Sequence, residues 1–315
     1  MTASPLPRSS GDTIANRRAD YAEMMFGEGQ AAAAAELMMS AMEIAPGWTL
    51  GWFRLGEFHE AAGAMAEAEQ AFRMCLKLDP VDQSGAALKL ALAGATEPLD
   101  RPPSAFVEAL FDQYAPTFDA SLVGKLGYKA PDLLAAAIGA ASTMPPPQPD
   151  GGGGLRPFRR ALDLGCGTGL MGERLRPLVG ELIGYDISAA MLKKAAAKNV
   201  YDHLEKVDLQ TLDGEGFNAD LVTAADVFLY LGALDRIART AKTMLQLGGL
   251  FVFSVEVHEG DGDFVLLPSR RYAHSEAYIR RLLEMQGFTV LALERGTIRL
   301  DRKEPIEGLI VVAQA

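Results

Sequence analysis

The feature that most constrains this chain is a glycine-rich turn between a short apolar run and a helical segment. In ALDLGCGTGLMGERL, residues 161–175, the apolar run ends at Asp163, and Gly165, Gly167 and Gly169 follow at every second position. Glycine allows backbone conformations that other residues resist, and its missing side chain lets a ligand approach the main chain. The helix predicted directly after the turn adds free N–H groups and partial positive charge. The pattern therefore predicts a ligand-binding turn between a strand and a helix.

A second acidic residue ends the next apolar run. GYD places Asp186 at the expected end of that strand, and a carboxylate there can accept hydrogen bonds from both hydroxyls of a ribose. Gly167, Gly169 and Gly172 also match the dinucleotide pattern G-x-G-x-x-G, so a nicotinamide-dependent oxidoreductase is one alternative. In that pattern the first glycine follows the strand directly, whereas Asp163 and the residues after it intervene here. A strand-end carboxylate would also repel a pyrophosphate. The spacing favours an amino-acid nucleoside over NAD.

Short apolar runs alternate with helical patterns over residues 159–315. The runs are ALDLG, ELIGYD, LEKVD, ADLVTAA, GGLFVFSVE, FTVLALE and EGLIVVA. This alternation is typical of an α/β fold with a doubly wound, mostly parallel sheet. Residues 15–98 are instead rich in Ala, Met, Leu and Glu and predict an all-α region. Residues 1–14 are expected to be a flexible N-terminus, and the Pro-then-Gly stretch 143–158 a surface loop.

The helical region contains a repeat. Pro46 and Pro80 lie 34 residues apart, each after an apolar helix ending. The residues between them match the spacing of the tetratricopeptide pattern at Trp52, Leu55, Gly56, Gly63, Ala68 and Phe72. The region resembles two tetratricopeptide repeats and a closing helix over 85–94, with a generic Ala-rich bundle as the alternative. Because such arrays need about three repeats to stand alone, this one is expected to pack on a protein partner, on a second copy, or on the rest of its own chain.

Composition excludes several classes of protein. The chain has 315 residues and a formal net charge of −11, which disfavours nucleic acid as a partner. Two cysteines, Cys75 and Cys166, cannot build a disulfide scaffold or a zinc site, and no metal is expected. The N-terminal residues lack the apolar core of a signal peptide, and no apolar run reaches the roughly 20 residues that span a bilayer. A cytoplasmic protein without membrane partners is expected.

The glycine-rich turn resembles a known signature. DLGCGTG looks like the first motif of the class I S-adenosylmethionine-dependent methyltransferases, and GYDISAAML looks like their second. The resemblance covers about residues 104–315, and residues 111–131 are similar to the helical lid of bacterial small-molecule methyltransferases. It implies lid helices over 99–142, a cofactor-binding domain with a seven-stranded Rossmann-like sheet over 159–315, and S-adenosylmethionine as cofactor. With its repeats, the chain is similar to a bacterial group of predicted tetratricopeptide-containing methyltransferases.

The resemblance also implies a set of cofactor contacts. Asp163 would face the methionine ammonium, and Asp186 would accept from the ribose hydroxyls. Asp208 would accept from the adenine amino group. The other implied contacts are Gly165, Cys166, Gly167 and Gly169 around the methionine and ribose, Ile187, Met191 and Leu209 against the adenine, Ala225 and Asp226 beside the methionine arm and substrate opening, and Tyr114, Phe118 and Tyr128 from the lid.

Several of these residues have structural alternatives. Asp208 can be a solvated turn residue, Asp226 can cap the following helix, and Cys166 can simply fill space. The three lid aromatics can form a packing face only.

The acceptor end is less determined. A base is needed only when the acceptor must lose a proton. The candidates are His258, which follows the fifth strand, and His274, which precedes a helix that Ser275 can cap. His274 is expected either on the surface before that cap or in the acceptor pocket, where replacing it with Ala would lower turnover and spare cofactor affinity. The acceptor is expected to be a small molecule or a carrier-bound acyl group. A protein-interaction scaffold that retains a cofactor site is the alternative from another class.

Overall fold

The chain divides into two compact units. A computed structural model describes residues 5–120, 127–142, 157–301 and 303–315. The units comprise residues 1–109 and 110–315, so the division falls inside α6 (Ser104–Tyr114) and not at the expected boundary of 98 and 99. Of the predicted Pro/Gly-rich loop at 143–158, residues 143–156 lie outside the described residues.

The first unit is a succession of helices. Each helix packs against the next one in the chain, and the buried side chains are mostly Ala, Met, Leu and Phe. The helix α1 begins within the segment expected to be flexible, because the Asp12 carboxylate accepts hydrogen bonds from the N–H groups of Ile14 and Ala15. The helices are α1 (Thr13–Gly27), α2 (Ala31–Ile44), α3 (Thr49–Ala61), α4 (Met65–Leu78) and α5 (Ala86–Leu92). The predicted helical region is thereby confirmed, while its repeat type stays a prediction.

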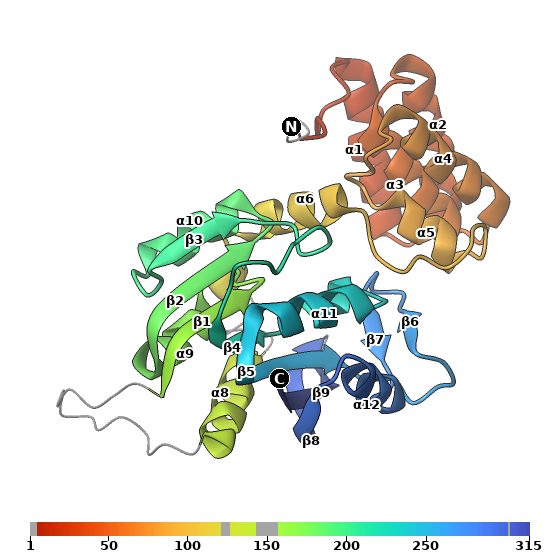
Figure 1. The fold of residues 1–315 in the computed structure, drawn as a ribbon. Helices are drawn as coiled ribbons and strands as arrows, with labels where there is room; N and C mark the ends of the chain where they lie inside the picture. Colours follow the sequence, from red (N-terminus) through yellow and green to blue (C-terminus); the bar gives the residue numbers. More distant parts are fainter. Residues whose placement is uncertain (1–4, 121–126, 143–156, 302) are drawn as a thin grey trace. The chain divides into compact units, whose positions relative to one another are not determined.

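The second unit is built on a mixed seven-stranded sheet in the order β3-β2-β1-β4-β5-β9-β8 (Figure 1). The strands β1 to β5 run parallel, and β9 is antiparallel to both of its neighbours. Chain order reverses between β1 and β4, and ligands of such sheets bind at the carboxyl ends beside this point. The strands are β1 (Phe158–Leu164), β2 (Val179–Asp186), β3 (His203–Lys206), β4 (Ala219–Ala224), β5 (Leu245–Glu256), β8 (Thr289–Asp301) and β9 (Glu304–Gln314). The predicted α/β fold is confirmed.

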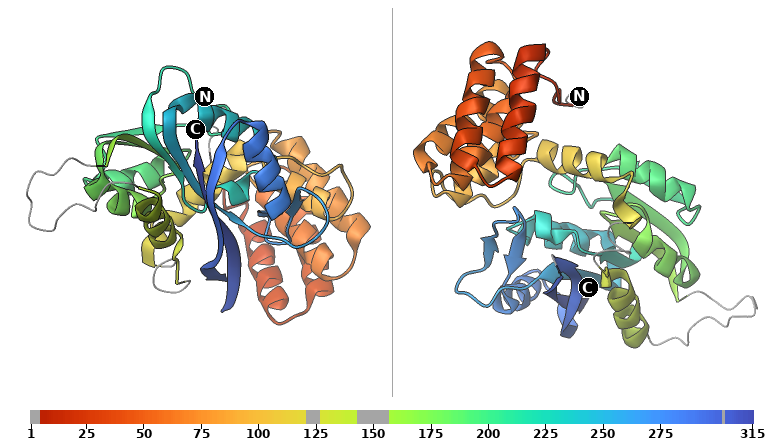
Figure 2. Two further views of the ribbon diagram at one scale, coloured as in Figure 1. Left: turned by 60° about the horizontal axis from the view of Figure 1, so that its bottom comes forward. Right: turned by 180° about the vertical axis from the view of Figure 1, so that it is seen from behind.

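Helices cover both faces of this sheet (Figures 1 and 2). Adjacent residues of β1 alternate between two cores: Leu162 packs with α11 (Asp235–Met244) and α12 (Glu276–Met285), whereas Ala161 packs with α8 (Ala130–Ala141) and α9 (Leu170–Leu175). The remaining elements are α10 (Ala189–Ala197), the short helices η1 (Arg176–Leu178) and η2 (Phe228–Tyr230), and an unexpected two-stranded sheet of β6 (Phe264–Leu266) and β7 (Tyr272–His274). Over the described residues, no helix is both long and apolar enough to cross a bilayer.

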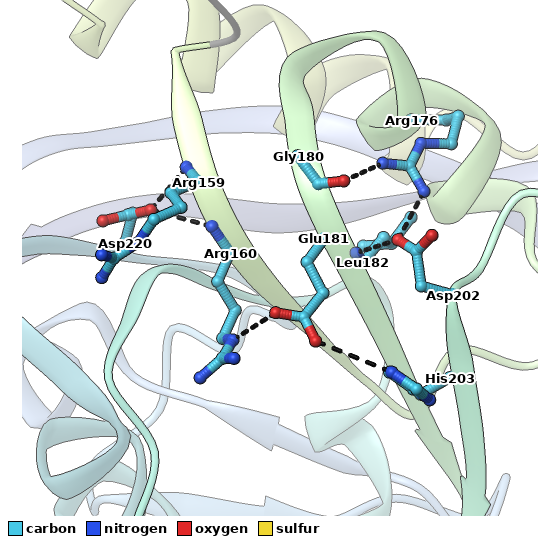
Figure 3. Close-up of polar contacts among 9 residues, drawn as sticks. All are labelled: Arg159, Arg160, Arg176, Gly180, Glu181, Leu182, Asp202, His203 and Asp220. Carbon is cyan, nitrogen blue, oxygen red and sulfur yellow. Dashed lines mark hydrogen bonds and ion pairs between the residues drawn. The ribbon is translucent and has the colours of Figure 1, made fainter.

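Ion pairs hold together the amino end of the sheet (Figure 3). Glu181 of β2 lies between Arg160 of β1 and His203 of β3, with 2.6 Å from Arg160 Nε to Glu181 Oε2 and 3.7 Å from His203 Nε2 to Glu181 Oε1. Nearby, Arg176 Nη1 lies 2.7 Å from Asp202 Oδ2, which also accepts the N–H of Leu182. Each of these two carboxylates therefore lies beside a guanidinium group.

Candidate functional site

The glycine-rich turn lies at the carboxyl end of β1. Gly165, Gly167 and Gly169 have φ angles of 65°, 54° and 90°, which are left-handed conformations that favour glycine. Among the described residues, a Cβ atom built on Gly167 would meet only Phe118, whose Cε1 would be 4.0 Å away. The main chain at Gly167 is therefore bare, as the close approach of a ligand requires.

Asp186 connects this turn to the end of β2. Its Oδ2 accepts the N–H of Gly167 at 2.8 Å, and its Oδ1 accepts the N–H of Ser188 at 2.8 Å. Each carboxylate oxygen has a second lone pair. The glycine turn and the loop after β2 are thus fixed around one carboxylate that can still accept hydrogen bonds from a ligand.

Asp163 lies near the end of β1, beside the strand that ends at Asp186, and is more deeply buried than Asp186. It stands beside Thr223 of β4 and Gly184 of β2 in the strand register. Thr223 Oγ1 donates to Asp163 Oδ1 at 2.9 Å, and Tyr201 Oη donates to Asp163 Oδ2 at 2.6 Å. Only 1% of Asp163 is exposed. Its influence on a ligand is therefore electrostatic, exerted through the turn that covers it.

Both carboxylates are held by neutral donors. Burial raises the pKa of Asp163 and of Asp186 from 3.8 to about 6, and hydrogen bonds offset part of this rise. Within the described part of the chain, neither forms an ion pair with a Lys, Arg or His side chain. Two buried anions without a counter-charge suit a ligand that carries a positive charge and hydroxyl groups, so the residues present fit S-adenosylmethionine.

The Tyr201 ring explains the third glycine of the dinucleotide-like pattern. A Cβ atom on Gly172 would collide with the Tyr201 phenol, and one on Gly184 would lie 2.8 Å from its Cε1. Gly172 therefore makes room for a tyrosine that reaches Asp163.

Two aspartates connect the segment around α6 to the site. Asp112 Oδ1 accepts a hydrogen bond from Ser188 Oγ at 2.5 Å, next to Asp186, and Asp119 accepts one from Thr168 Oγ1 in the glycine turn. Of the three predicted lid aromatics, Phe118 lies over Gly167, Tyr128 donates to the carbonyl oxygen of Ala225 at 3.2 Å, and Tyr114 is 51% exposed.

A buried ion-pair cluster lies beyond the end of β4. Arg299 of β8 donates to Asp226 and, at 2.5 Å, to Glu256 at the end of β5. Asp226 has a φ of 57°, and its N–H donates to Ser254 Oγ at 2.9 Å. The Arg299 side chain is 3% exposed, so this pairing holds Asp226 in an unfavourable backbone conformation.

The residues expected around adenine differ in their exposure to solvent. Ile187, Asp208 and Leu209 are half-buried and follow β2 and β3, whose ends are joined by the N–H of Val207 donating to the Asp186 carbonyl. Asp208 Oδ1 accepts the N–H of Gln210 at 2.8 Å, as a turn residue does. Met191 lies in the first turn of α10, which Ser188 caps, and has no exposed surface. A direct contact between Met191 and adenine therefore does not fit this arrangement.

The histidines differ from the expectation for a base. His274 is fully buried, and its Nε2 lies 2.9 Å from the carbonyl oxygens of both Leu231 and Gly232. Burial lowers its pKa to about 4. Neither a surface position nor an open acceptor pocket surrounds it, and its ring serves as a neutral donor to the turn at 231 and 232. His258 follows β5 as expected, and its Nδ1 accepts the N–H of Gly260 at 3.1 Å.

Sequence reasoning missed the residues that support the site from distant elements. Ser188 carried a signal, since Ser before an Ala-rich segment is typical of a helix N-cap. The other missed residues are Asp112, Asp119, Tyr201, Thr223, Glu256 and Arg299, and no local pattern marks them. Burial raises the pKa of the Cys166 thiol, whose side chain is buried within the turn as a space-filling residue would be.

Comparison with known proteins identifies the central part of this unit. Residues 162–251 match the family described as "Methyltransferase domain". Two curated malonyl-[acyl-carrier protein] O-methyltransferases are similar: that of Enterobacter lignolyticus is 29% identical over 99 residues, covering 31% of this chain and 39% of the relative. That of Legionella pneumophila is 31% identical over 101 residues, covering 30% and 36%. The chain thus spans less than two fifths of either relative.

Solved structures share the fold. The 1,6-didemethyltoxoflavin N1-methyltransferase of Burkholderia thailandensis, solved with S-adenosylhomocysteine, is 19% identical and covers 70% of this chain and 92% of its own, with a TM-score of 0.51. The [4+2]-cyclase SpnF, also 19% identical, covers 66% and 94% with a TM-score of 0.51. The family match confirms S-adenosylmethionine as the predicted cofactor. Residues 162–251 are therefore similar to a methyltransferase domain, and the chain shares the fold of the solved structures named above.

Proposed function

We propose that this protein transfers a methyl group from S-adenosylmethionine to a small-molecule or carrier-bound acceptor. The observation that carries the proposal is the pair of buried carboxylates at the ends of β1 and β2, held by neutral donors beside a bare glycine turn. A cationic nucleoside with free ribose hydroxyls supplies the charge and the donors that these anions accept.

The residues have separate tasks in this proposal. Asp186, oriented by two backbone N–H groups, accepts from the ribose hydroxyls. Asp163 provides negative potential for the methionine end from beneath the turn. The other proposed contacts are the main chain of 165–169, Ile187, Asp208 and Leu209 at the adenine, Ala225 and Asp226 at the methionine arm, and Phe118, Tyr128 and Tyr114 from the lid.

Positioning is the main catalytic requirement. When bound, S-adenosylmethionine supplies a methyl group on a positively charged sulfur, which leaves without protonation. The chemistry that it would supply is an in-line displacement at the methyl carbon, in which the carbon–sulfur bond would break as the bond to the acceptor forms. Holding the acceptor in line and excluding water would then supply most of the acceleration. A carboxylate acceptor attacks without a base. With His274 enclosed, such an acceptor is the one we favour, and the names of the two curated relatives support it.

Methyl-labelled S-adenosylmethionine tests the proposal directly. The full-length protein is incubated with a malonyl-loaded acyl carrier protein and, separately, with small carboxylic acids. Label is expected in an ester product, with an equal amount of S-adenosylhomocysteine formed. Tight binding of S-adenosylhomocysteine without transfer to any acceptor would favour the scaffold alternative, and no binding would contradict both.

We also propose that α1–α5 are tetratricopeptide-type repeats that bind a protein partner or a second copy of the chain. The support is close helix packing at small residues: a Cβ atom on Gly56 would lie 2.5 Å from the Phe72 ring, and Ala68 is 2% exposed. A Gly56→Leu variant should separate these helices and lower the free energy of unfolding. Sedimentation of the full chain tests self-association, and a monomer at all concentrations would exclude it.

A further inference from the structure

Tyr201 occupies a position that the methyltransferase motifs do not account for. It lies between α10 and β3, where the N–H of the following residue, Asp202, donates to the carbonyl oxygen of Leu182 at 2.9 Å. This backbone bond fixes the segment against β2. The Tyr201 phenol then extends from β2 towards the end of β1 and donates to Asp163 Oδ2 at 2.6 Å.

The path of the Tyr201 ring is lined by glycines from three elements. Gly169 closes the glycine turn, Gly172 lies in α9, and Gly184 lies in β2 directly beside Asp163 in the register. A Cβ atom would lie 3.1 Å from the ring at Gly169 and 2.8 Å at Gly184, and it would collide at Gly172. A side chain at Gly172 or Gly184 would therefore occupy space that the ring of Tyr201 fills.

The phenol stays a donor under all physiological conditions. Burial raises the pKa of Tyr201 well above its usual value, and the neighbouring Asp163 carboxylate raises it further. Other groups that face Asp163 are the Thr223 hydroxyl, the Cys166 thiol, the Asp186 carboxylate and the Tyr128 phenol. Tyr201 and Thr223 are the two that donate to the ionised form of Asp163, one to each oxygen.

We propose that Tyr201 is a positioning residue for cofactor binding, which fixes the Asp163 carboxylate beneath the glycine turn by donating to its Oδ2. The inference rests on the proposed function, because it takes Asp163 to act on the methionine end of S-adenosylmethionine. Tyr201 touches no reacting atom and acts through Asp163 alone.

The test is the pH dependence of cofactor affinity in Tyr201→Phe, which keeps the ring and removes the donor. Loss of one donor raises the pKa of Asp163 above its present value of about 6. Dissociation constants for S-adenosylmethionine are measured by calorimetry from about pH 5.5 to about pH 8.5. Near pH 6.5 the variant should bind about threefold more weakly for a pKa rise of about one unit, and the difference should approach about tenfold at the acid end of the range. At the alkaline end, where Asp163 is ionised in both proteins, the two affinities should converge.

Tyr278→Phe is the matched control. Its phenol is also buried and also donates to an aspartate, Asp235, at 3.1 Å, but on α12 and outside the site. This variant should keep the wild-type pH profile. Thr223→Val removes the donor to the other Asp163 oxygen and should shift the profile in the same direction as Tyr201→Phe, which provides a second reading if the first variant folds poorly.

The outcomes separate the two proposals. A wild-type protein that binds neither S-adenosylmethionine nor S-adenosylhomocysteine would contradict the proposed function. A wild-type protein that binds them, with a ratio of variant to wild-type affinity that is constant over pH, would overturn the role of Tyr201.

Discussion

The two ends of the parallel sheet differ in whether their buried or partly buried carboxylates lie beside a positively charged side chain. At the amino end, Glu181 and Asp202 lie beside arginines (Figure 3). Burial is the largest single influence on the pKa of Asp202 and raises it, but the hydrogen bonds from Arg176 and from the main chain, together with the nearby positive charge, outweigh it, so the pKa is lowered. At the carboxyl end, the donors to Asp163 and Asp186 among the described residues are all neutral, and burial raises the pKa of each to about 6. Compensated charge stabilises the fold, whereas uncompensated charge is available to a cationic ligand.

The Arg299 cluster provides a strong test of this contrast, because it is a compensated site at the carboxyl end. In Arg299→Leu, the buried Asp226 and Glu256 lose their counter-charge, and the free energy of unfolding should fall by about 3–5 kcal/mol. Urea denaturation measures this change. Arg295→Leu on the same strand removes an exposed pair with Glu259 and should leave the free energy of unfolding unchanged. If the two substitutions lowered the free energy of unfolding equally, burial would not determine how much each ion pair contributes to stability.

Removing an uncompensated carboxylate should cost affinity more than stability. Asp186→Ala removes the proposed acceptor of two ribose hydroxyls, and S-adenosylhomocysteine should bind about 100-fold more weakly, since hydrogen bonds to a charged group contribute about 1.5–3 kcal/mol each. Calorimetry measures the change, with Asp202→Ala at the amino end as the control. Retained affinity in Asp186→Ala would mean that the ribose site is misplaced.

The pH dependence should have opposite signs for folding and for binding. Because the folded-state pKa values of Asp163 and Asp186 are raised, their contribution to stability is fully present below about pH 4 and is lost as pH rises through about 6. A cationic ligand prefers the ionised form. The rise in Tm caused by saturating S-adenosylmethionine should therefore be larger near pH 8 than near pH 5, and thermal unfolding with and without ligand measures it. A ligand effect that is independent of pH would show that neither carboxylate faces the cation.

The smallest effect is expected at the amino end. Arg160→Ala breaks the partly exposed pair with Glu181 and should lower the free energy of unfolding by at most about 1 kcal/mol. The affinity for S-adenosylhomocysteine should stay at the wild-type value. Weakened binding in this variant would show that the ion pairs at the amino end of the sheet influence ligand affinity at the carboxyl end, which would contradict the contrast between the two ends.

The predictable part of the site is the part that is local in sequence. The glycine turn, the strand-end acids and the order of strands and helices follow from spacings within short segments, and the structure has them where the pattern predicts them. Gly172 shows the limit. Its spacing imitates a dinucleotide motif, yet its function is to contact Tyr201, which lies 29 residues further along the chain.

Contacts between elements that are distant in the chain could not be predicted from the sequence. Arg299 meets Asp226 and Glu256 only because β8, β9 and β5 pair in one sheet, and no spacing encodes that pairing. The helix cap that follows His274 predicts a surface or pocket position for it, but His274 is the last residue of β7 and is fully buried. The motif position of Met191 predicts a contact with adenine, whereas its side chain has no exposed surface.

The ring of Tyr201 and the glycines around it occupy one shared volume, and this limits how the sequence can change. A methyl group gained at position 172 or 184 requires a smaller side chain at 201, and a smaller side chain there removes the donor to Asp163. Positions 169, 172, 184 and 201, which come from four separate segments, are therefore expected to vary together among relatives. Related chains with alanine at position 172 should hold the strand-end acid with a different donor, and should bind the cofactor with a different dependence on pH.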